Sequence, residues 1–179
     1  PETGFTLPAL TPKHFSFNSH FGACPRCHGL GSCLDPDPTL FVPFPEKSIN
    51  QGGIKTWWSG SKKKKGAYDR LIESLVLHMN EDPDKPIKDM SREFKRALFY
   101  GTKEAMQTPW STKPFEGLSN HARRLLEESK SEITKRNVRR FMSHKPCDEC
   151  EGKRLKPSIL AVTLAHETEA RSIQGLTNL

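Results

Sequence analysis

Two widely separated cysteine pairs constrain the fold of this chain more than any other feature. One lies in ACPRCHGLGSC, residues 23–33, and the other in KPCDECEGKRL, residues 145–155. Both follow the pattern C-x-x-C-x-G, in which two thiolates reach one metal ion from a tight turn and the glycine permits a positive φ beside it. Two such knuckles predict one closed, tetrahedral and structural zinc site. Its expected ligands are Cys24, Cys27, Cys147 and Cys150.

Other assignments of the cysteines fit the sequence less well. His28 and Cys33 are rival ligands. We expect His28 to lie at the surface or to contact the ligands without binding the metal, and Cys33 to be a packed or free thiol. A disulfide framework would need an oxidising compartment, and we find no export signal that would support one. A further alternative is that the thiols are buried and reduced without binding a metal. That alternative does not explain why the glycine is repeated in both pairs, so we prefer zinc.

A zinc clamp at these positions makes the chain between the knuckles an insertion that is held at its neck. We therefore expect an insertion domain at residues 35–143, with residues 1–34 and 144–179 forming the zinc-knuckle module and its flanking pieces. The hydrophobic content is only 34%, so we expect no large buried core, and a metal would help folding. The fold class predicted is α+β: a mostly helical insertion domain with short strands, on a small four-cysteine zinc-knuckle module.

Hydrophobic residues at helical spacing predict helices within the insertion. These are expected at about residues 66–80, 91–100, 118–128 and 131–143. Ser91 should cap the second of them and Gly101 should end it. Ser129 and Glu132 have the spacing of a capping box at the start of the last.

The remaining segments are expected to be extended or irregular. Prolines argue against a helix in residues 1–22, and they limit residues 102–116 to irregular structure or a short hairpin. Short strands are expected at residues 40–42 and 159–164. The basic run Lys62–Lys65 is interpreted as a solvated loop in preference to a specific contact.

The balance of charge favours an anionic partner. The formal net charge is +7, and nucleic acid is the commonest partner of such a chain. Basic residues are densest in residues 123–156. The side chains expected to contact DNA phosphates are Arg123, Arg124, Lys135, Arg136, Arg139, Arg140, Lys145, Lys153 and Arg154.

Within this set, Arg136, Arg139 and Arg140 have spacings that place them on one helix face. The opposite, apolar face is expected to carry Ile133, Val138 and Phe141. The alternative is a solvated surface in which the basic groups form local ion pairs. Their partners would be Glu127, Glu128 and Glu132.

Three tryptophans are further candidates for contact with DNA. Trp57, Trp58 and Trp110 could stack on bases, but core packing is the commoner role and is expected for at least one of them. Contacts through phosphates would be independent of sequence and sensitive to salt.

Several of these segments resemble one known family. FSFNSHFGACPRCHGLG and KPCDECEGKRL are similar to the cysteine motifs of UvrA, the ATPase component of the ABC excinuclease. Pro114–Gly117, Leu98–Gly101 and the tail SIQGLTNL resemble further segments of that family. The family consists of dimeric ABC-type ATPases that detect damaged DNA in bacterial nucleotide excision repair and load a partner protein, UvrB.

The resemblance implies that residues 35–143 are the family's insertion domain. The zinc module, with flanking pieces of the ATPase signature region, would surround it within the first nucleotide-binding half. The implied partners are double-stranded DNA, the remainder of the UvrA-like protein and its dimer mate. UvrB would bind only through regions absent here, no membrane is implied, and the implied location is cytoplasmic.

Two departures from the family pattern limit what this chain is expected to do. No G-x-x-x-x-G-K-[ST] phosphate loop and no LSGGQ-like signature occur, so we expect no enzymatic activity, and ATP would bind only to the full-length protein. Thr3 also stands where the family usually has a cysteine.

Two other classes of protein remain as alternatives. The first is a DnaJ-like zinc module that binds unfolded peptide, because C-x-x-C-x-G-x-G also occurs there, although only the first knuckle here has the second glycine, Gly31. The other is a zinc hydrolase, which would need an open position on the metal and a general base.

Overall fold

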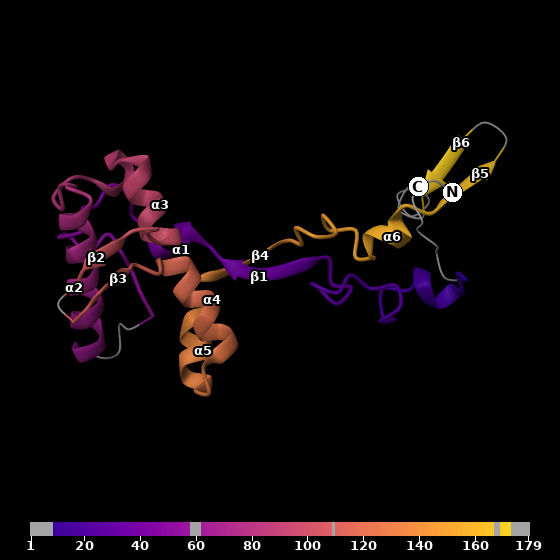
Figure 1. Cartoon of the computed structure of the whole chain (residues 1–179), viewed down its shortest axis with the longest axis horizontal. Coiled ribbons are helices and arrows are strands. Elements are labelled where there is room, and N and C mark those ends of the chain that lie inside the picture. The colour runs from indigo at the N-terminus through magenta and orange to yellow at the C-terminus, as the bar shows by residue number, and fades with distance from the viewer. Residues whose placement is uncertain (1–8, 58–61, 109, 167–168, 173–179) are drawn as a thin grey trace. The chain divides into compact units, whose positions relative to one another are not determined.

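The computed structural model describes residues 9–57, 62–108, 110–166 and 169–172, and the chain divides into two compact units. We call residues 1–34 and 144–179 the cysteine unit and residues 35–143 the helical unit. Helices and short antiparallel strands occur together (Figure 1), so the predicted α+β class is confirmed. Among the described residues, no helix has the length and apolar character needed to cross a membrane.

Strands β1 (Ser32–Pro36) and β4 (Met142–Pro146) form a two-stranded sheet. Their pairing is flanked by the bonds from the Cys147 N–H to the Gly31 carbonyl, 2.9 Å, and from the Asp37 N–H to the Phe141 carbonyl, 3.0 Å. The chain therefore leaves the cysteine unit and returns to it along paired strands.

The cysteine unit also contains short regular elements. These are a 3₁₀ helix at Pro12–Phe15, helix α6 at Pro157–Leu160, and the antiparallel strands β5 (Thr163–His166) and β6 (Glu169–Ser172). Two predictions were wrong here, because Pro12 and Pro157 each begin a helical turn, the position that proline favours. The strand expected at residues 159–164 begins only at Thr163.

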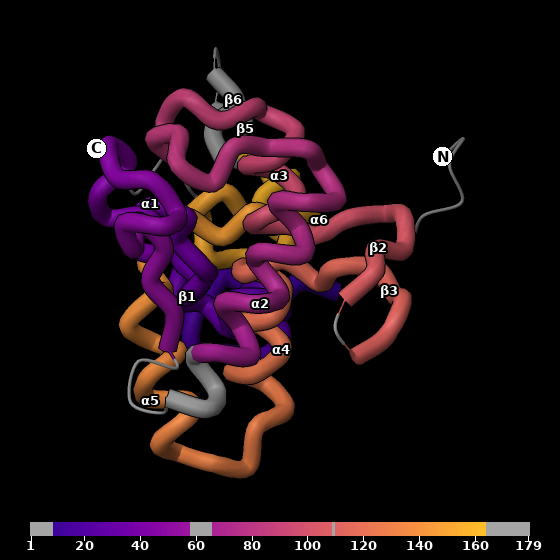
Figure 2. Tube along the Cα trace, turned by 90° about the vertical axis from the view of Figure 1, so that its left-hand side faces the viewer, coloured from indigo at the N-terminus to yellow at the C-terminus, as the bar shows by residue number. Residues whose placement is uncertain are grey.

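The helical unit holds most of the helices. Its elements are α1 (Pro38–Phe41), α2 (Lys62–His78), a 3₁₀ helix (Ile87–Asp89), α3 (Arg92–Tyr100), β2 (Ala105–Gln107), β3 (Thr112–Pro114), α4 (Leu118–Glu128) and α5 (Glu132–Arg139). Helix α3 contacts both α2 and α4, and α4 and α5 lie side by side as a helical hairpin (Figures 1 and 2).

Several sequence predictions for this unit are confirmed. The Ser91 hydroxyl accepts the Phe94 N–H at 3.2 Å and caps α3, which ends at Gly101 with φ 88°. A Cβ at Gly101 would overlap the Phe115 carbonyl oxygen, so this position requires glycine. Helix α4 has the predicted bounds, and β2 and β3 form the short hairpin expected in that region, with Met106 opposite Lys113.

The last helix begins within one residue of its predicted start, but its predicted cap and its predicted end were wrong. Ser129 follows the end of α4, and the side chain of Ser131 caps α5 by accepting the Thr134 N–H at 3.3 Å. Helix α5 ends at Arg139, because Met142 belongs to β4 and pairs with β1. Strand pairing outweighs the helical spacing of the apolar residues at this point.

Two further segments are helical where other structure was expected. Residues 40–42 were predicted as a strand, but Asp37 caps α1 by accepting the Thr39 N–H at 3.0 Å, and Pro38 occupies the first helical position. The lysine run 62–65 begins α2 and does not form a loop.

The hydrophobic core lies in the helical unit. Its fully buried large side chains include Phe41, Leu75, Phe94, Leu98, Met106 and Leu118. Trp57 is 3% exposed and packs its edge against Phe41 and Tyr68, so the expected core role of one tryptophan is confirmed. Trp110 is 56% exposed, and Trp58, like Thr3, lies outside the described residues.

Candidate metal centre and nucleic-acid interface

The first cysteine knuckle is a tight turn built around buried sulfur atoms. Cys24 and Cys27 are buried, and the Gly31 N–H points at the Cys27 Sγ at 3.2 Å. The turn passes through His28 at φ 51° and Gly29 at φ 81°. A Cβ at Gly29 would overlap the Phe17 carbonyl oxygen, so glycine is required for space as well as for conformation.

The second knuckle repeats this geometry. Glu151 has φ 51° and Gly152 has φ 83°, the same sequence of left-handed residues. The Arg154 N–H points at the Cys150 Sγ at 3.3 Å, again from four residues beyond the cysteine. The Arg154 carbonyl also accepts the Cys24 N–H at 2.7 Å, which joins the two knuckles through the backbone.

The knuckles bring all four predicted ligands together. The Sγ atoms of Cys24 and Cys147 are 3.9 Å apart, those of Cys27 and Cys150 are 3.7 Å apart, and all four lie within 4.8 Å of one another. Zinc–sulfur bonds of about 2.3 Å in a tetrahedron place sulfur atoms about 3.8 Å apart. The cluster can therefore hold a metal ion, and its four soft donors would fill a tetrahedral shell.

The rival ligands lie outside this group. Cys33 is half-buried and packs against the four cysteines, whereas His28 is exposed. Neither belongs to the metal-binding group found among the described residues. Both positions are as expected from the sequence.

The electrostatics of the cluster favour a bound cation. Burial raises the pKa of the Cys24 thiol to about 12. Burial also opposes ionisation of Cys147, but backbone N–H donors from Cys150 and Glu149 outweigh it and lower the pKa of that thiol to about 7. Four thiolates in one buried place need a positive charge among them, because unpaired buried charge is very unfavourable.

The arginines of α4 are held by carboxylates. Arg123 donates from Nη2 to Asp35 at 2.8 Å. Arg124 forms a bidentate pair with Glu116, at 2.6 and 2.9 Å, and approaches Glu128 at 3.6 Å. The hydrogen bond from Arg124 is the main reason that the pKa of Glu116 is lowered. These two guanidinium groups have partners within the protein.

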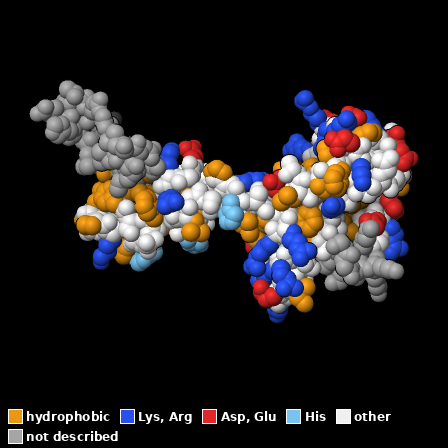
Figure 3. Space-filling view, turned by 180° about the vertical axis from the view of Figure 1, so that it is seen from behind, with side chains coloured by type: hydrophobic (Ala, Val, Ile, Leu, Met, Phe, Trp, Pro, Cys, Tyr) orange, Lys and Arg blue, Asp and Glu red, His pale blue; other side chains and the backbone are white. Residues whose placement is uncertain are grey.

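The arginines near the C-terminal end of α5, where Arg140 is the C-cap, have different surroundings. Arg136, Arg139 and Arg140 are exposed, and none of them forms an ion pair with another residue in the described part of the chain. Lys135 approaches Glu132 at 3.8 Å. Lys and Arg side chains gather over α5 in the space-filling view (Figure 3). Carboxylates of the neighbouring turns thus account for Arg124 and Lys135 but not for these arginines.

The expectation for the apolar face of this helix was partly wrong. Val138 is fully buried and Phe141 stacks on Phe41 with ring centroids 5.0 Å apart, but Ile133 is 65% exposed. At 100° per residue, Ile133 lies about 140° from Val138 around the helix and about 20° from Arg140. Ile133 therefore shares the side of Arg136 and Arg140, whereas Arg139 lies about 120° away from it.

The other predicted DNA contacts lie in the cysteine unit. Lys153 pairs with Glu151 at 2.8 Å, and the Arg154 guanidinium lies over the Phe17 ring at 5.4 Å from its centroid. Lys145 is half-buried on β4. The six remaining basic residues of the predicted set belong to the helical unit.

Sequence reasoning missed two exposed features of the helical unit. One is the exposure of Ile133, which a helical projection limited to residues 132–139 would have revealed. The other is the contact of Trp110, a residue already named as a candidate for stacking on bases, with the Arg70 guanidinium, which lies 5.6 Å from its ring centroid. No sequence signal links residues so far apart along the chain.

Comparison with known proteins gives consistent matches. Residues 37–140 match a family model described as the UvrA DNA-binding domain. The UvrABC system protein A of Methanothermobacter thermautotrophicus is 40% identical over 98% of this chain and 19% of its own length. That of Clostridium perfringens is 36% identical over 91% of this chain and 18% of its own.

A solved structure has the same fold. The crystal structure of UvrA2 from Deinococcus radiodurans matches with a TM-score of 0.61 at 22% sequence identity, over 90% of this chain and 21% of that one. The chain spans about a fifth of the length of the curated relatives that it matches.

Proposed function

Because this chain belongs to the UvrA family, we propose that it is a DNA-contacting, non-catalytic part of the UvrA component of nucleotide excision repair. The helical unit makes the contacts to duplex DNA. The cysteine unit binds one structural zinc ion, which holds together the two ends of the inserted segment.

The exposed arginines of α5 carry this proposal. Arg136, Arg139 and Arg140 are solvent-facing cations, and the described residues offer them no carboxylate. Guanidinium groups bind phosphate oxygens strongly and can do so in bidentate fashion. They lie inside the segment that matches the UvrA DNA-binding domain, so the backbone of duplex DNA is the partner that fits them.

The same reasoning ranks the other basic residues. Arg123 and Arg124 already bind carboxylates, so their main role is to hold α4 to Asp35 of β1 and to Glu116 in the segment before α4. Lys135, Lys145, Lys153 and Arg154 are secondary candidates for phosphate contacts. Phosphate contacts do not depend on the base sequence, and they weaken as the salt concentration rises.

Zinc is proposed because the donors fit that ion. Tetrahedral four-thiolate sites are typical of structural zinc, and a shell filled by protein leaves no position for a reacting water. A hydrolase mechanism therefore has no place in this proposal. Cys24, Cys27, Cys147 and Cys150 would serve as the ligands.

The remaining activities of the system are assigned to other parts of the protein. The sequence contains no phosphate loop, so ATP binding belongs to the rest of the UvrA-like protein, as do its dimer contacts and the docking of UvrB. The expected location is the cytoplasm, beside the chromosome. The DnaJ-like alternative rested on the knuckle motif alone, and membership in the UvrA family removes that basis.

Salt-dependent binding to duplex DNA tests the proposal. We would compare the parent chain with the triple variant Arg136→Ala/Arg139→Ala/Arg140→Ala across a range of salt concentrations. If each arginine contacts one phosphate, the log–log slope falls by up to about 2.7 in magnitude. Affinity at low salt should also fall at least about tenfold.

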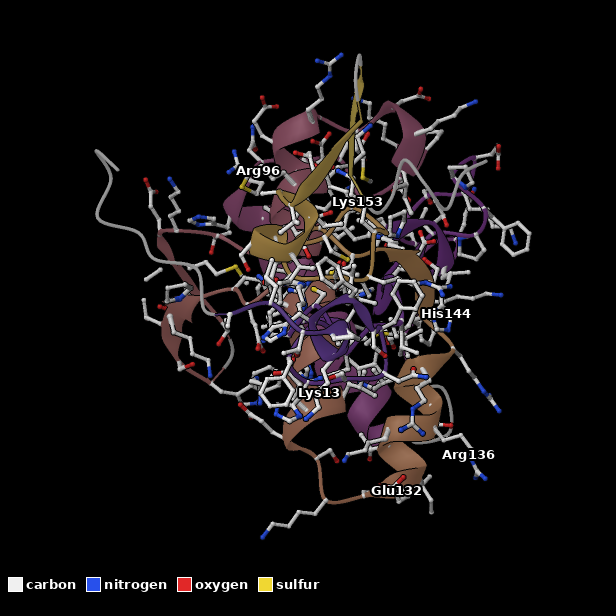
Figure 4. The ribbon with its side chains drawn as sticks, turned by 90° about the vertical axis from the view of Figure 1, so that its right-hand side faces the viewer. Lys13, Arg96, Glu132, Arg136, His144 and Lys153 are labelled. Carbon is white, nitrogen blue, oxygen red and sulfur yellow. The ribbon has the colours of Figure 1, made fainter. Side chains whose placement is uncertain are left out.

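A matched control separates contact from overall charge. Arg92, Arg96 and Lys103 are also exposed basic residues of the helical unit, so their triple alanine variant has the same net charge. Figure 4 shows Arg96 in the upper part of the view and Arg136 in the lower part. The control should bind like the parent. Equal losses in both variants, or parent binding that does not respond to salt, would contradict the proposal.

A further inference from the structure

Ile133 is an exposed apolar side chain within the basic surface of α5. It is 65% exposed, and Arg136, Asn137 and Arg140 follow it at spacings of three, four and seven residues. These spacings place the four residues on one helix face. One isoleucine thus heads a polar and cationic stripe, which we call the α5 stripe: Ile133, Arg136, Asn137 and Arg140.

The position of Ile133 is firmly held. It lies in the first turn of α5, two residues after the cap Ser131, whose hydroxyl accepts the Thr134 N–H at 3.3 Å. That turn is near the end of the α4–α5 hairpin, at the bottom of Figure 1. Glu132 and Arg136 are labelled together on this helix in Figure 4. The backbone that presents Ile133 is therefore helical and close to the tip of a protruding element.

A single exposed isoleucine is not evidence of a binding site, because much of any protein surface is apolar. The arginines beside Ile133 make it informative here. With a rise of 1.5 Å per residue, Arg136 and Arg140 follow Ile133 by about 4.5 and 10.5 Å along the helix axis. If those arginines bind phosphates at the edge of a groove, Ile133, about 4.5 Å from Arg136 along the axis, is close enough to reach into it.

We propose that Ile133 is an apolar wedge that tests base stacking in the duplex held by the α5 arginines. The inference rests on the function proposed above and adds to it one residue that distinguishes weakly stacked from regularly stacked DNA. Proteins that bend DNA commonly insert an isoleucine, leucine or phenylalanine between adjacent base pairs. Partial unstacking costs less where a base is damaged, missing or mismatched. The wedge therefore favours weakly stacked sites of any sequence.

Competition between two duplexes tests this role. The zinc-loaded 179-residue chain would be offered a fully paired duplex and the same duplex with one central abasic position. We expect the parent to prefer the abasic duplex by roughly tenfold, a difference of about 1.4 kcal/mol. Ile133→Ser should reduce the preference to about twofold or less, while its affinity for the paired duplex changes by no more than about twofold. Ile133→Leu should keep the preference, because the wedge remains apolar.

Leu77 provides the matched control. It is 81% exposed on α2 and no basic residue precedes or follows it within three positions other than His78. Leu77→Ser should keep both the affinity and the preference of the parent. Both serine variants replace exposed side chains, so both are expected to fold, and circular dichroism with zinc content checks this.

The outcomes separate this inference from the proposed function. If Ile133→Ser keeps the preference, if it weakens both duplexes equally, or if the parent has no preference, the wedge is wrong. The function proposed above still stands in each case, provided that the arginine variant loses salt-dependent binding. If the parent does not bind duplex DNA at all, both proposals fall.

Discussion

The two units of this chain are stabilised by different chemistry. The helical unit has an apolar core of large side chains, among them Phe41, Phe94 and Leu98, all fully buried. Among the described residues of the cysteine unit, the cluster of buried side chains consists of four cysteines with Cys33 packed against it, and the buried Leu155 and Ile159 lie outside that cluster. We therefore expect apolar burial to stabilise mainly the helical unit, and the four sulfur atoms, with the ion that they can bind, to stabilise the cysteine unit. The predictions that follow test this difference.

Removal of zinc should have the largest effect, and it should be confined to one unit. Zinc binding in small four-ligand sites supplies roughly 10 kcal/mol or more of folding free energy. A chelator should therefore abolish hydrogen-exchange protection at residues 22–34 and 144–156, while α3 and α4 stay protected. Mass spectrometry of the exchanged peptides would measure this. Simultaneous loss of protection in both units would show that the helical unit also depends on the metal.

Truncation of a core side chain should destabilise the helical unit and leave the cysteine unit unchanged. Leu98→Ala removes a fully buried side chain and should lower the free energy of unfolding of the helical unit by about 2–5 kcal/mol. Zinc content should not change. The control Leu77→Ala truncates a side chain that is 81% exposed and should change stability by less than about 0.5 kcal/mol. Loss of zinc from the Leu98 variant would refute the separation of the two units.

The duplicated knuckle glycines should differ in their tolerance of alanine. Both have positive φ, so each substitution introduces about 1–2 kcal/mol of backbone strain. At Gly29 the new Cβ would also overlap the Phe17 carbonyl oxygen, whereas at Gly152 it would lie 3.8 Å from the Gly31 carbonyl oxygen. Gly29→Ala should therefore weaken zinc binding more than Gly152→Ala. Chelator competition would measure both, and equal effects would mean that strain alone decides.

A pH-dependent contact in the helical unit should have the smallest effect. The Glu81 carboxylate accepts the Ser91 hydroxyl at 2.6 Å and the Ser91 N–H at 3.1 Å, and these bonds lower its pKa from 4.5. Since the folded-state pKa is depressed, the stabilisation is complete above the unfolded value and is lost as pH falls through the folded value.

Replacement of this carboxylate should show the same dependence. Glu81→Gln should lower stability by about 1–2 kcal/mol at pH 7. The difference from the parent should shrink as pH falls below 4.5. Urea unfolding at several pH values would measure it, and a difference that does not vary with pH would exclude the carboxylate as its source.

Local signals predicted the parts of this fold that local physics determines. Ser91, the apolar spacing after it and Gly101 specify α3 because the cap and the stop are properties of the backbone there. The cysteine cluster was also predictable, since the repeated C-x-x-C-x-G motif specifies the same turn twice. Each of these features depends on residues within a few positions of one another, or on a motif that is present in both parts.

The errors came from contacts between distant segments. Met142 has helical spacing from the preceding apolar residues, but pairing with β1 draws it into a strand. Ile133 was grouped with Val138 and Phe141 on one apolar face of a helix expected at residues 131–143, but α5 ends at Arg139 and Phe141 lies beyond it. Likewise, nothing local distinguishes Arg124, which binds Glu116 from the preceding loop, from Arg136, which has no such partner among the described residues.

The zinc stoichiometry of single cysteine variants tests the central claim most directly. The paired knuckles predict one zinc ion per parent chain, and no tightly bound zinc in either Cys24→Ser or Cys147→Ser, because each removes one of four ligands from the same ion. Cys33→Ser should keep one ion, since that thiol only packs against the cluster. A variant with either knuckle altered that still retained a full zinc ion would contradict the account.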